Sequence, residues 1–175
     1  MKIREANIED AENIKNVHLQ AFDESEAQIV SDLAANLLKN DGPVKALSLV
    51  AMENNEIVGH VAFSPVFLES TNEHFAYILA PLAVSPKLQN KNIGSSLVEF
   101  GLDAISNLGT FIVFVYGDPQ YYSRFGFKTE SADKFVPPYT LQFSEGWQVM
   151  QLNVNSLPDG GKITCVDALN NLELW

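Results

Sequence analysis

The sequence is poor in cysteine and in long apolar runs. A single cysteine, Cys165, occurs among 175 residues, which excludes an internal disulfide and a multi-cysteine metal site, and we expect no metal. No apolar run approaches the roughly 20 residues that span a bilayer. The N-terminus, Met1-Lys2-Ile3-Arg4-Glu5, lacks the apolar stretch of a signal peptide. These absences predict a cytoplasmic protein that does not bind membranes.

Basic residues are also scarce. The chain has 11 Lys and Arg against 22 Asp and Glu, a formal net charge of −11. We expect no nucleic-acid partner, because affinity for a phosphate backbone needs clustered Lys and Arg. An acidic surface attracts cationic amine substrates, although the same charge also serves solubility alone.

What is present is the composition of a folded protein. Hydrophobic residues make up 46% of the chain and charged residues 19%, which is typical of a globular domain. The length suits one compact core, and no linker, repeat or low-complexity segment divides it. We expect a single domain over residues 1–175.

The first third of the chain predicts one strand followed by two helices. Residues 2–6 suit a short strand, and Asn7 with Asp10 three residues later suits a helix N-cap. Helical spacing of apolar residues follows. An acidic break at Asp23-Glu24 separates a second amphipathic helix, which ends by Gly42-Pro43.

Three strands and a helix follow. Residues 46–52 and 57–68 read as strands joined by Asn54-Asn55, a pair that tolerates the positive φ of a tight hairpin. Residues 74–84 form a third strand, in which Pro81 predicts a bulge or an unpaired edge. An amphipathic helix is predicted over residues 93–108.

The continuously apolar segment 110–116 predicts a central strand covered on both faces. Later expectations are a brief helix over 120–124, a strand near Phe127, a strand over 147–154 and a turn at Pro158-Asp159-Gly160-Gly161. This order of elements predicts a mixed α/β (α+β) fold.

The connection between residues 84 and 93 is a candidate phosphate site. A strand ends at Val84 and a helix opens near Ile93, so unpaired N–H groups and the positive end of a helix dipole meet there. Gly94 permits close approach, and Lys91 and Ser95 add a charge and a hydroxyl donor. The segment is neither a P-loop nor a Rossmann fingerprint. Taken alone, the segment is more often an ordinary strand-to-helix connection, with Asn92 as the N-cap.

Two sequence blocks remove that ambiguity. The first is Leu82-Ala83-Val84-Ser85-Pro86 followed by Gln89-Asn90-Lys91-Asn92-Ile93-Gly94. The second, one helix and one strand later, is Gly117-Asp118-Pro119-Gln120-Tyr121-Tyr122-Ser123-Arg124-Phe125-Gly126-Phe127. In this order they resemble the GNAT acyltransferase superfamily, specifically its YhbS-like bacterial branch. The resemblance covers residues 1 to about 130, the core with the cofactor motifs, and leaves residues 131–175 as a C-terminal extension of the same domain.

The resemblance implies a GNAT fold, a splayed and mostly antiparallel central sheet flanked by helices, and acetyl-CoA as the cofactor. The pantetheine arm is expected in the gap between the strand ending at Val84 and the strand 110–116, with the pyrophosphate on the following turn. Asn90 and Asn92 replace family glycines, and asparagine is the next most tolerant residue of left-handed φ. The implied cofactor residues are Leu82, Val84, Gln89, Asn90, Lys91, Asn92, Ile93, Gly94 and Ser95.

The implied reaction is direct transfer of an acetyl group to a primary amine of an unidentified acceptor. The tyrosine that family members use to protonate the departing thiolate matches Tyr122, with Tyr121 as the alternative. No carboxylate occurs in residues 75–84, where many family members carry a base. A water chain ending at an acidic residue, or an amine that arrives neutral, is the alternative.

Three acidic residues are candidates for recognising a cationic acceptor. Asp23, Glu24 and Glu26 are expected in the connection between the first two helices, which the resemblance places beside the acceptor site. The simpler interpretation is an exposed polar helix break. His18 and His60 read as packed or surface residues without a motif, and Cys165 has no partner for nucleophilic catalysis.

Other functions remain open from the sequence. A non-catalytic CoA-binding or regulatory module would explain the replaced glycines and the missing strand carboxylate. An interaction protein that pairs its strand 147–154 with another subunit is a third hypothesis. Residues 131–175 are expected to complete either the acceptor pocket or the interface of a homodimer.

Overall fold

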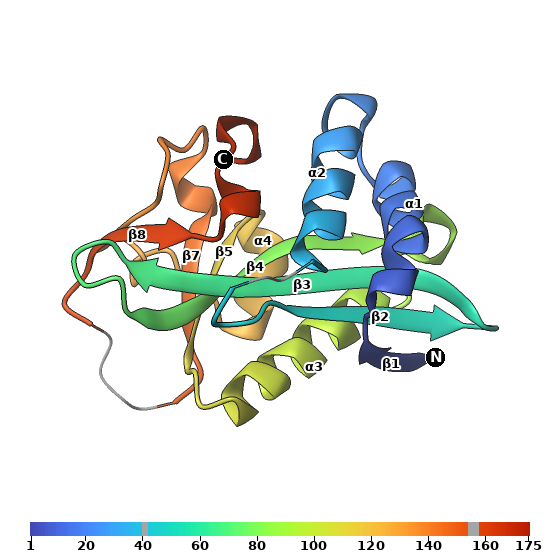
Figure 1. Ribbon diagram of the computed structural model, residues 1–175, viewed down its shortest axis with the longest axis horizontal. Coiled ribbons are helices and arrows are strands. Elements are labelled where there is room, and N and C mark those ends of the chain that lie inside the picture. Colours follow the sequence, from blue (N-terminus) through green and yellow to red (C-terminus); the bar gives the residue numbers. More distant parts are fainter. Residues whose placement is uncertain (40–41, 154–157) are drawn as a thin grey trace.

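A computed structural model describes residues 1–39, 42–153 and 158–175. Its centre is an eight-stranded sheet with the order β1-β2-β3-β4-β5-β7, to which β8 adds by pairing with β3 and β6 (Figure 1). All the pairs are antiparallel except β4 with β5 and β6 with β8. The predicted α/β layout, with a mostly antiparallel sheet, is confirmed.

The strands are β1 (Lys2–Glu5), β2 (Leu47–Glu53), β3 (Glu56–Leu68), β4 (His74–Val84), β5 (Ile112–Tyr116), β6 (Phe135–Val136), β7 (Trp147–Gln151) and β8 (Gly161–Cys165). The α-helices are α1 (Ala11–Ala21), α2 (Glu24–Leu37), α3 (Ile93–Asn107) and α4 (Pro119–Tyr122). Short 3₁₀ turns cover Ile8–Asp10, Pro86–Leu88, Ser123–Phe125, Ser144–Gly146, Asp167–Leu169 and Leu172–Leu174.

Helices cover the two faces of the sheet separately. In Figure 1, α1 and α2 lie on one face and α3 on the other. Alternate strand residues point to opposite faces, so apolar clusters form on both sides of the sheet, including a small one of Ile14, Ala34 and Val50. The two largest clusters lie on opposite sides. One gathers under α2 around Leu33, Leu37 and Phe114, and the other under α3 around Leu97 and Phe63.

Local sequence signals explain several boundaries. Asn7 and Asp10 form the predicted capping box, in which the Asn7 N–H donates to Asp10 Oδ2 at 2.9 Å. Asn54 and Asn55 adopt φ values of 50° and 67° and close the predicted β2–β3 hairpin. The strand β5 is buried on both faces, as its continuous apolar run predicted.

Other boundaries differ from the prediction. Asp23 and Glu24 do not interrupt the chain for long, because Asp23 occupies the N-cap position of α2 and Glu24 already belongs to its first turn. Acidic side chains favour that turn through the helix dipole. Phe127 is buried outside any strand, beside an isolated bridge between Lys128 and Val149.

The C-terminal region contributes more to the sheet than its sequence indicated. The strand predicted over 147–154 is β7, which pairs with β5, and Val154 lies outside the described residues. The strand β8 was not predicted; it adds to β3 through Val66↔Cys165. Among the described residues, no helix combines the length and apolarity needed to cross a membrane.

Candidate active site between two diverging strands

The candidate site begins where β4 and β5 separate. The two strands pair in parallel from Tyr77↔Val113 to Leu79↔Val115 and no further. Beyond Leu79, β4 continues to Val84 while keeping its pairing with β3. The edge of β4 over residues 80–84 is therefore turned away from β5, which is the splay that the sequence predicted.

A bulge in β4 accompanies the separation. Val61 of β3 pairs with Leu82 of β4, and the next pair is Phe63 with Leu79. One residue of β3 but two residues of β4 lie between these pairs, so β4 has one extra residue there. The extra residue falls at the cis Ala80–Pro81 bond. Proline has no N–H to donate to a neighbouring strand, so the predicted bulge at Pro81 is confirmed.

The N-terminus of α3 lies just past the end of β4. Asn90 and Asn92 have φ values of 61° and 62°. This is the left-handed conformation expected at positions where the family pattern has glycine. The first intrahelical bond runs from the Ser96 N–H to the Asn92 carbonyl at 2.9 Å. The N–H groups of Ile93, Gly94 and Ser95 precede it and have no acceptor within the helix, so they suit an anion.

The other predicted cofactor residues lie around this helix end. Leu82 and Val84 are half-buried on β4, and Lys91 is exposed in the turn. The Gln89 side chain donates from Nε2 to the Val84 carbonyl at 3.1 Å, which ties the turn to the strand. Ile93 is buried against the α3 core, so only its main chain is available to a ligand.

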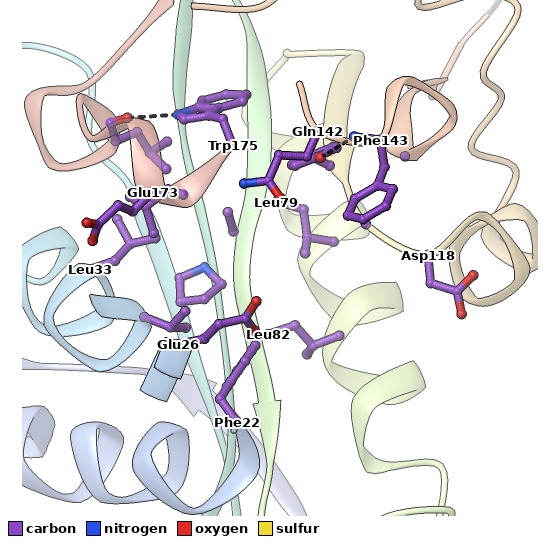
Figure 2. A pocket seen from close by; sticks show the side chains of 18 of the residues that line it. Phe22, Glu26, Leu33, Leu79, Leu82, Asp118, Gln142, Phe143, Glu173 and Trp175 are labelled. Carbon is purple, nitrogen blue, oxygen red and sulfur yellow. Dashed lines mark hydrogen bonds between the residues drawn. The ribbon is translucent and has the colours of Figure 1, made fainter. Parts of the chain in front are cut away.

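A cavity of about 580 Å³ opens on the other side of the splay (Figure 2). Its walls come from four parts of the chain: the start of α2, the β4 bulge, the β5–α4 connection and the C-terminal region. Figure 2 shows Glu26 reaching from α2 toward Leu82 of β4, with Trp175 and Gln142 on the opposite wall. The lining residues are Phe22, Glu26, Ile29, Val30, Leu33, Leu79, Ala80, Pro81, Leu82, Tyr116, Gly117, Asp118, Pro119, Tyr122, Gln142, Phe143, Glu145, Gly146, Leu169, Glu173, Leu174 and Trp175.

Neighbouring tyrosines of α4 face different parts of the site. Tyr122 lines the cavity, and its ring packs edge-on against Phe127 at a centroid distance of 5.8 Å. Tyr121 does not line the cavity and instead places its hydroxyl against Gly94 at the start of α3. The Arg124 guanidinium lies over the Tyr121 ring, 4.0 Å from its centroid. The helix thus presents one phenol to the cavity and the other to the N-terminus of α3, the candidate anion site.

Burial keeps the Tyr122 phenol protonated. The pKa of Tyr122 is raised above its ordinary value of 10, mainly because burial disfavours the phenolate and also because Tyr121 and Asp118 repel negative charge there. A raised pKa makes the group a persistent O–H donor and, equally, a weaker acid than a free phenol. At neutral pH it therefore donates a hydrogen bond and does not ionise.

Comparison with known proteins assigns the family. Residues 45–129 match the acetyltransferase (GNAT) domain. Over 162 residues the chain is 34% identical to YjhQ of Escherichia coli strain K12, an uncharacterized N-acetyltransferase, covering 90% of this chain and 88% of that protein. The chain belongs to the GNAT acetyltransferase family. It is therefore an acyltransferase, as the two sequence blocks predicted.

Two solved GNAT structures resemble it along nearly the whole chain. YhbS of Escherichia coli, solved in complex with CoA, superposes with a TM-score of 0.83 at 28% identity over 97% of this chain and 92% of that one. A GNAT acetyltransferase from Brucella melitensis, solved with acetyl-CoA, gives 0.72 at 28% identity over 97% of both chains. The GNAT fold is thus confirmed together with the family.

The three acidic candidates separate in this GNAT enzyme. Glu26 lines the cavity, whereas Asp23 and Glu24 do not. Glu24 and Glu26 lie in the first turn of α2, so their predicted place in the connection between the helices is wrong. The strand β4 supplies no carboxylate to the cavity, and Pro81 lies where its bulge faces that space.

Much of the cavity wall was not predicted from sequence. Tyr116, Gln142, Phe143 and Trp175 line it, and Trp175 stacks on Tyr116 at 6.4 Å between ring centroids. The expectation that residues 131–175 contribute to this pocket gave no individual residue. Tyr116 ends β5, whereas Gln142, Phe143 and Trp175 stand outside helices and strands, so no periodic sequence signal identifies these three.

The remaining reactive groups lie outside the cavity. His18 Nε2 and His60 Nδ1 are 2.8 Å apart, and Ser48 Oγ lies 2.7 Å from His60 Nε2, all within the core beneath α1. Burial lowers the pKa of His18 to about 4. Burial also raises the pKa of Cys165 to about 12, which keeps this thiol protonated and a poor nucleophile.

Proposed function

We propose that this GNAT enzyme transfers an acetyl group from acetyl-CoA directly to a primary amine. The observation that carries the proposal is the continuity of three features: the α3 N-terminus, the unpaired edge of β4 and the cavity lined by Tyr122. A chain that merely shared the fold would not need a phenol at the point where the splay opens into a cavity.

Acetyl-CoA fits the residues at the donor end. The N–H groups at the start of α3 and the positive end of its dipole suit a pyrophosphate, and Lys91 adds a positive charge in the adjacent turn. The edge of β4 at Leu82 and Val84, which does not pair with β5, offers main-chain groups to the amides of a pantetheine arm, and the Val84 carbonyl also accepts from Gln89 Nε2. Bound there, acetyl-CoA supplies a thioester as the acyl donor.

Tyr122 holds the proton that a departing thiolate requires. Its raised pKa keeps the phenol protonated at neutral pH, so its O–H can donate a hydrogen bond to the sulfur as negative charge develops there. Full proton transfer to a thiolate, whose conjugate acid has a pKa of about 8.5, is uphill from this phenol. The half-buried lining limits competing water at this point. Cys165, buried away from the cavity, does not support an acyl-enzyme route.

Two measurements test this function. Acetyl-CoA should raise the unfolding temperature, because a ligand of the native state stabilises it by an amount that grows with the logarithm of the ligand concentration relative to Kd. Release of free CoA thiol with a panel of amines should then show turnover. A thermal shift without thiol release would favour the alternative of a non-catalytic CoA-binding module, and no shift at about millimolar acetyl-CoA would reject both.

The domain organisation, cellular location and oligomeric state of the enzyme are also proposals. We infer one domain over residues 1–175, supported by the addition of β7 and β8 to the sheet. Activity in the cytoplasm is inferred from the need for acetyl-CoA. The homodimer stays a prediction, which light scattering of the purified protein would test.

A further inference from the structure

The cavity combines a buried apolar floor with an acidic rim. The floor consists of Leu33, Leu79, Pro81, Leu169 and Trp175, all buried; Trp175, for example, is 3% exposed. The acidic rim consists of Glu26, Asp118, Glu145 and Glu173, all exposed. In Figure 2, Glu26 and Glu173 lie on one side of the opening and Asp118 on the other.

The negative charge of the rim is not neutralised within the described chain. None of the described residues that line the cavity is Lys, Arg or His. The ion pairs found among the described residues join Arg4 to Asp10, Lys15 to Asp32 and Lys162 to Glu69, and so involve no rim carboxylate. Carboxylates of one sign around a low-dielectric hollow focus the field and raise the local concentration of cations.

The floor imposes the opposite requirement. An ammonium group that enters an apolar space loses its hydration, so the neutral amine is favoured there. Acyl transfer needs this neutral form, and β4 carries no carboxylate that would generate it. A neutral amine on the floor gains little electrostatic attraction from the rim carboxylates. The rim charge is therefore available to bind a second, cationic group of the acceptor.

We infer that the acceptor is a polycationic amine: one amino group enters the floor and is acetylated, while at least one further cationic group stays at the rim. The inference rests on the proposed function and specifies its substrate. An α,ω-diamine or a longer polyamine satisfies both parts of the cavity. A monoamine leaves the rim unpaired, and an amino acid brings its own carboxylate against the rim.

The size of the preference follows from the exposure of the rim. An exposed ion pair contributes about fivefold in affinity at most, because water and salt screen it. A second cation that meets two rim carboxylates should therefore bind on the order of tenfold more tightly than the matching monoamine. The preference should shrink in about 0.5 M salt, which shortens the screening length.

The test compares 1,5-diaminopentane with pentylamine, which differ only in the second amino group. Calorimetry in the presence of CoA measures the binding of each amine, and thiol release from acetyl-CoA measures kcat/KM for each. The variants are Glu26→Gln, Glu145→Gln and Glu173→Gln. The matched control is Glu12→Gln, an exposed glutamate in the first turn of α1 that is outside the cavity lining.

We expect the diamine to be preferred about tenfold in both measurements. The diamine-to-monoamine ratio should fall by about threefold to fivefold in rim variants and stay constant in Glu12→Gln. Equal binding of the two amines, or a ratio unchanged in all three rim variants, would overturn the inference whether or not turnover occurs. Thiol release that favours pentylamine would likewise overturn it while leaving the acetyltransferase function intact. Absence of thiol release with a clear diamine preference in binding would reject the proposed function alone.

Discussion

The hydroxyl group of Tyr121 fills the space in front of Gly94, where a Cβ on residue 94 would lie only 2.7 Å from its oxygen. This contact assigns Tyr121 to the end of the site that faces the α3 N-terminus. Tyr122, one residue later, lines the cavity at the other end. Adjacent residues of α4 therefore face the two ends of the site: Tyr121 faces the proposed CoA-binding end and Tyr122 the cavity proposed for the acceptor.

Gly94→Ala should weaken CoA binding by about tenfold. The added methyl group would push the Tyr121 hydroxyl, the flexible end of a side chain, toward the space in front of the helix N-terminus. The helix itself should not suffer, since alanine has a higher helix propensity than glycine by about 1 kcal/mol. Titration calorimetry with CoA measures the affinity, and unchanged affinity would contradict a pyrophosphate site here.

Gly101→Ala is the contrasting variant on the same helix. A Cβ there would overlap the ring of Phe63, which is fully buried beneath α3. Overpacking of this kind costs about 1–3 kcal/mol, so urea unfolding should show lower stability. CoA affinity of the folded fraction should be retained. Loss of affinity in both variants would mean that the helix responds as a whole and that Gly94 has no local role.

Tyr122→Phe should lower kcat by about 100-fold while the affinity for CoA stays nearly constant. The substitution removes the phenolic proton and keeps the ring that packs against Phe127. Steady-state thiol release gives kcat, and calorimetry gives the affinity. If Tyr121→Phe lowers kcat and Tyr122→Phe does not, the acid is Tyr121 and the expected role of Tyr122 is wrong.

Asn92→Ala should destabilise the protein by about 1–2 kcal/mol, because alanine resists the left-handed conformation that residue 92 adopts at φ 62°. Asn92→Gly is the matched control and should be nearly neutral, since glycine takes this φ without a steric cost. Thermal unfolding of the two variants gives the comparison. Equal stability of the two would show that the turn rearranges rather than holding this conformation.

Stability should fall as the pH drops from about 6.5 toward 4. The folded state holds His18 and His60 neutral, because one proton between His18 Nε2 and His60 Nδ1 makes their hydrogen bond and a second would break it. Burial lowers the pKa of both rings, while the unfolded chain takes up protons near 6.5. Below that value the unfolded state binds more protons and gains free energy, so this stabilisation is fully present only above it.

The depressed pKa of His18 alone should lower the free energy of unfolding by about 2 kcal/mol between neutral pH and about pH 5. The depressed pKa of His60 lowers it further. Urea unfolding at about pH 7.5 and about pH 5 measures the difference. His60→Gln, which keeps a hydrogen-bonding amide and cannot titrate, should flatten the dependence. If that variant fails to fold, calorimetric proton uptake on unfolding of the natural chain decides, and no uptake near pH 5 would contradict the assignment.

Local rules predicted those parts of the site that depend on few neighbouring residues. The left-handed conformation of Asn90 and Asn92 follows from the position of glycine in the GNAT pattern and from the steric tolerance of asparagine. The bulge at Pro81 follows from the missing N–H of proline. Each is decided within a few residues, so one sequence suffices.

Features that depend on distant segments were not predictable in the same way. Gly161-Lys162-Ile163-Thr164-Cys165 follows a glycine-rich turn and is too short to show a clear period, yet β3 offers it an edge at Val66. Trp175 reaches the cavity because Tyr116 and Trp147 provide a surface for its ring. Whether Tyr121 or Tyr122 lines the cavity depends on the direction in which each side chain projects from α4. The sequence does not distinguish two adjacent tyrosines in this respect.

The origin of the cavity walls has a consequence for how such enzymes diverge. The proposed donor end is built within residues 82–95, whereas the rim and floor also draw on α2, the β5–α4 connection and segments from Gln142 onward. Mutations in those distant segments can reshape what enters the cavity while the cofactor machinery is inherited unchanged.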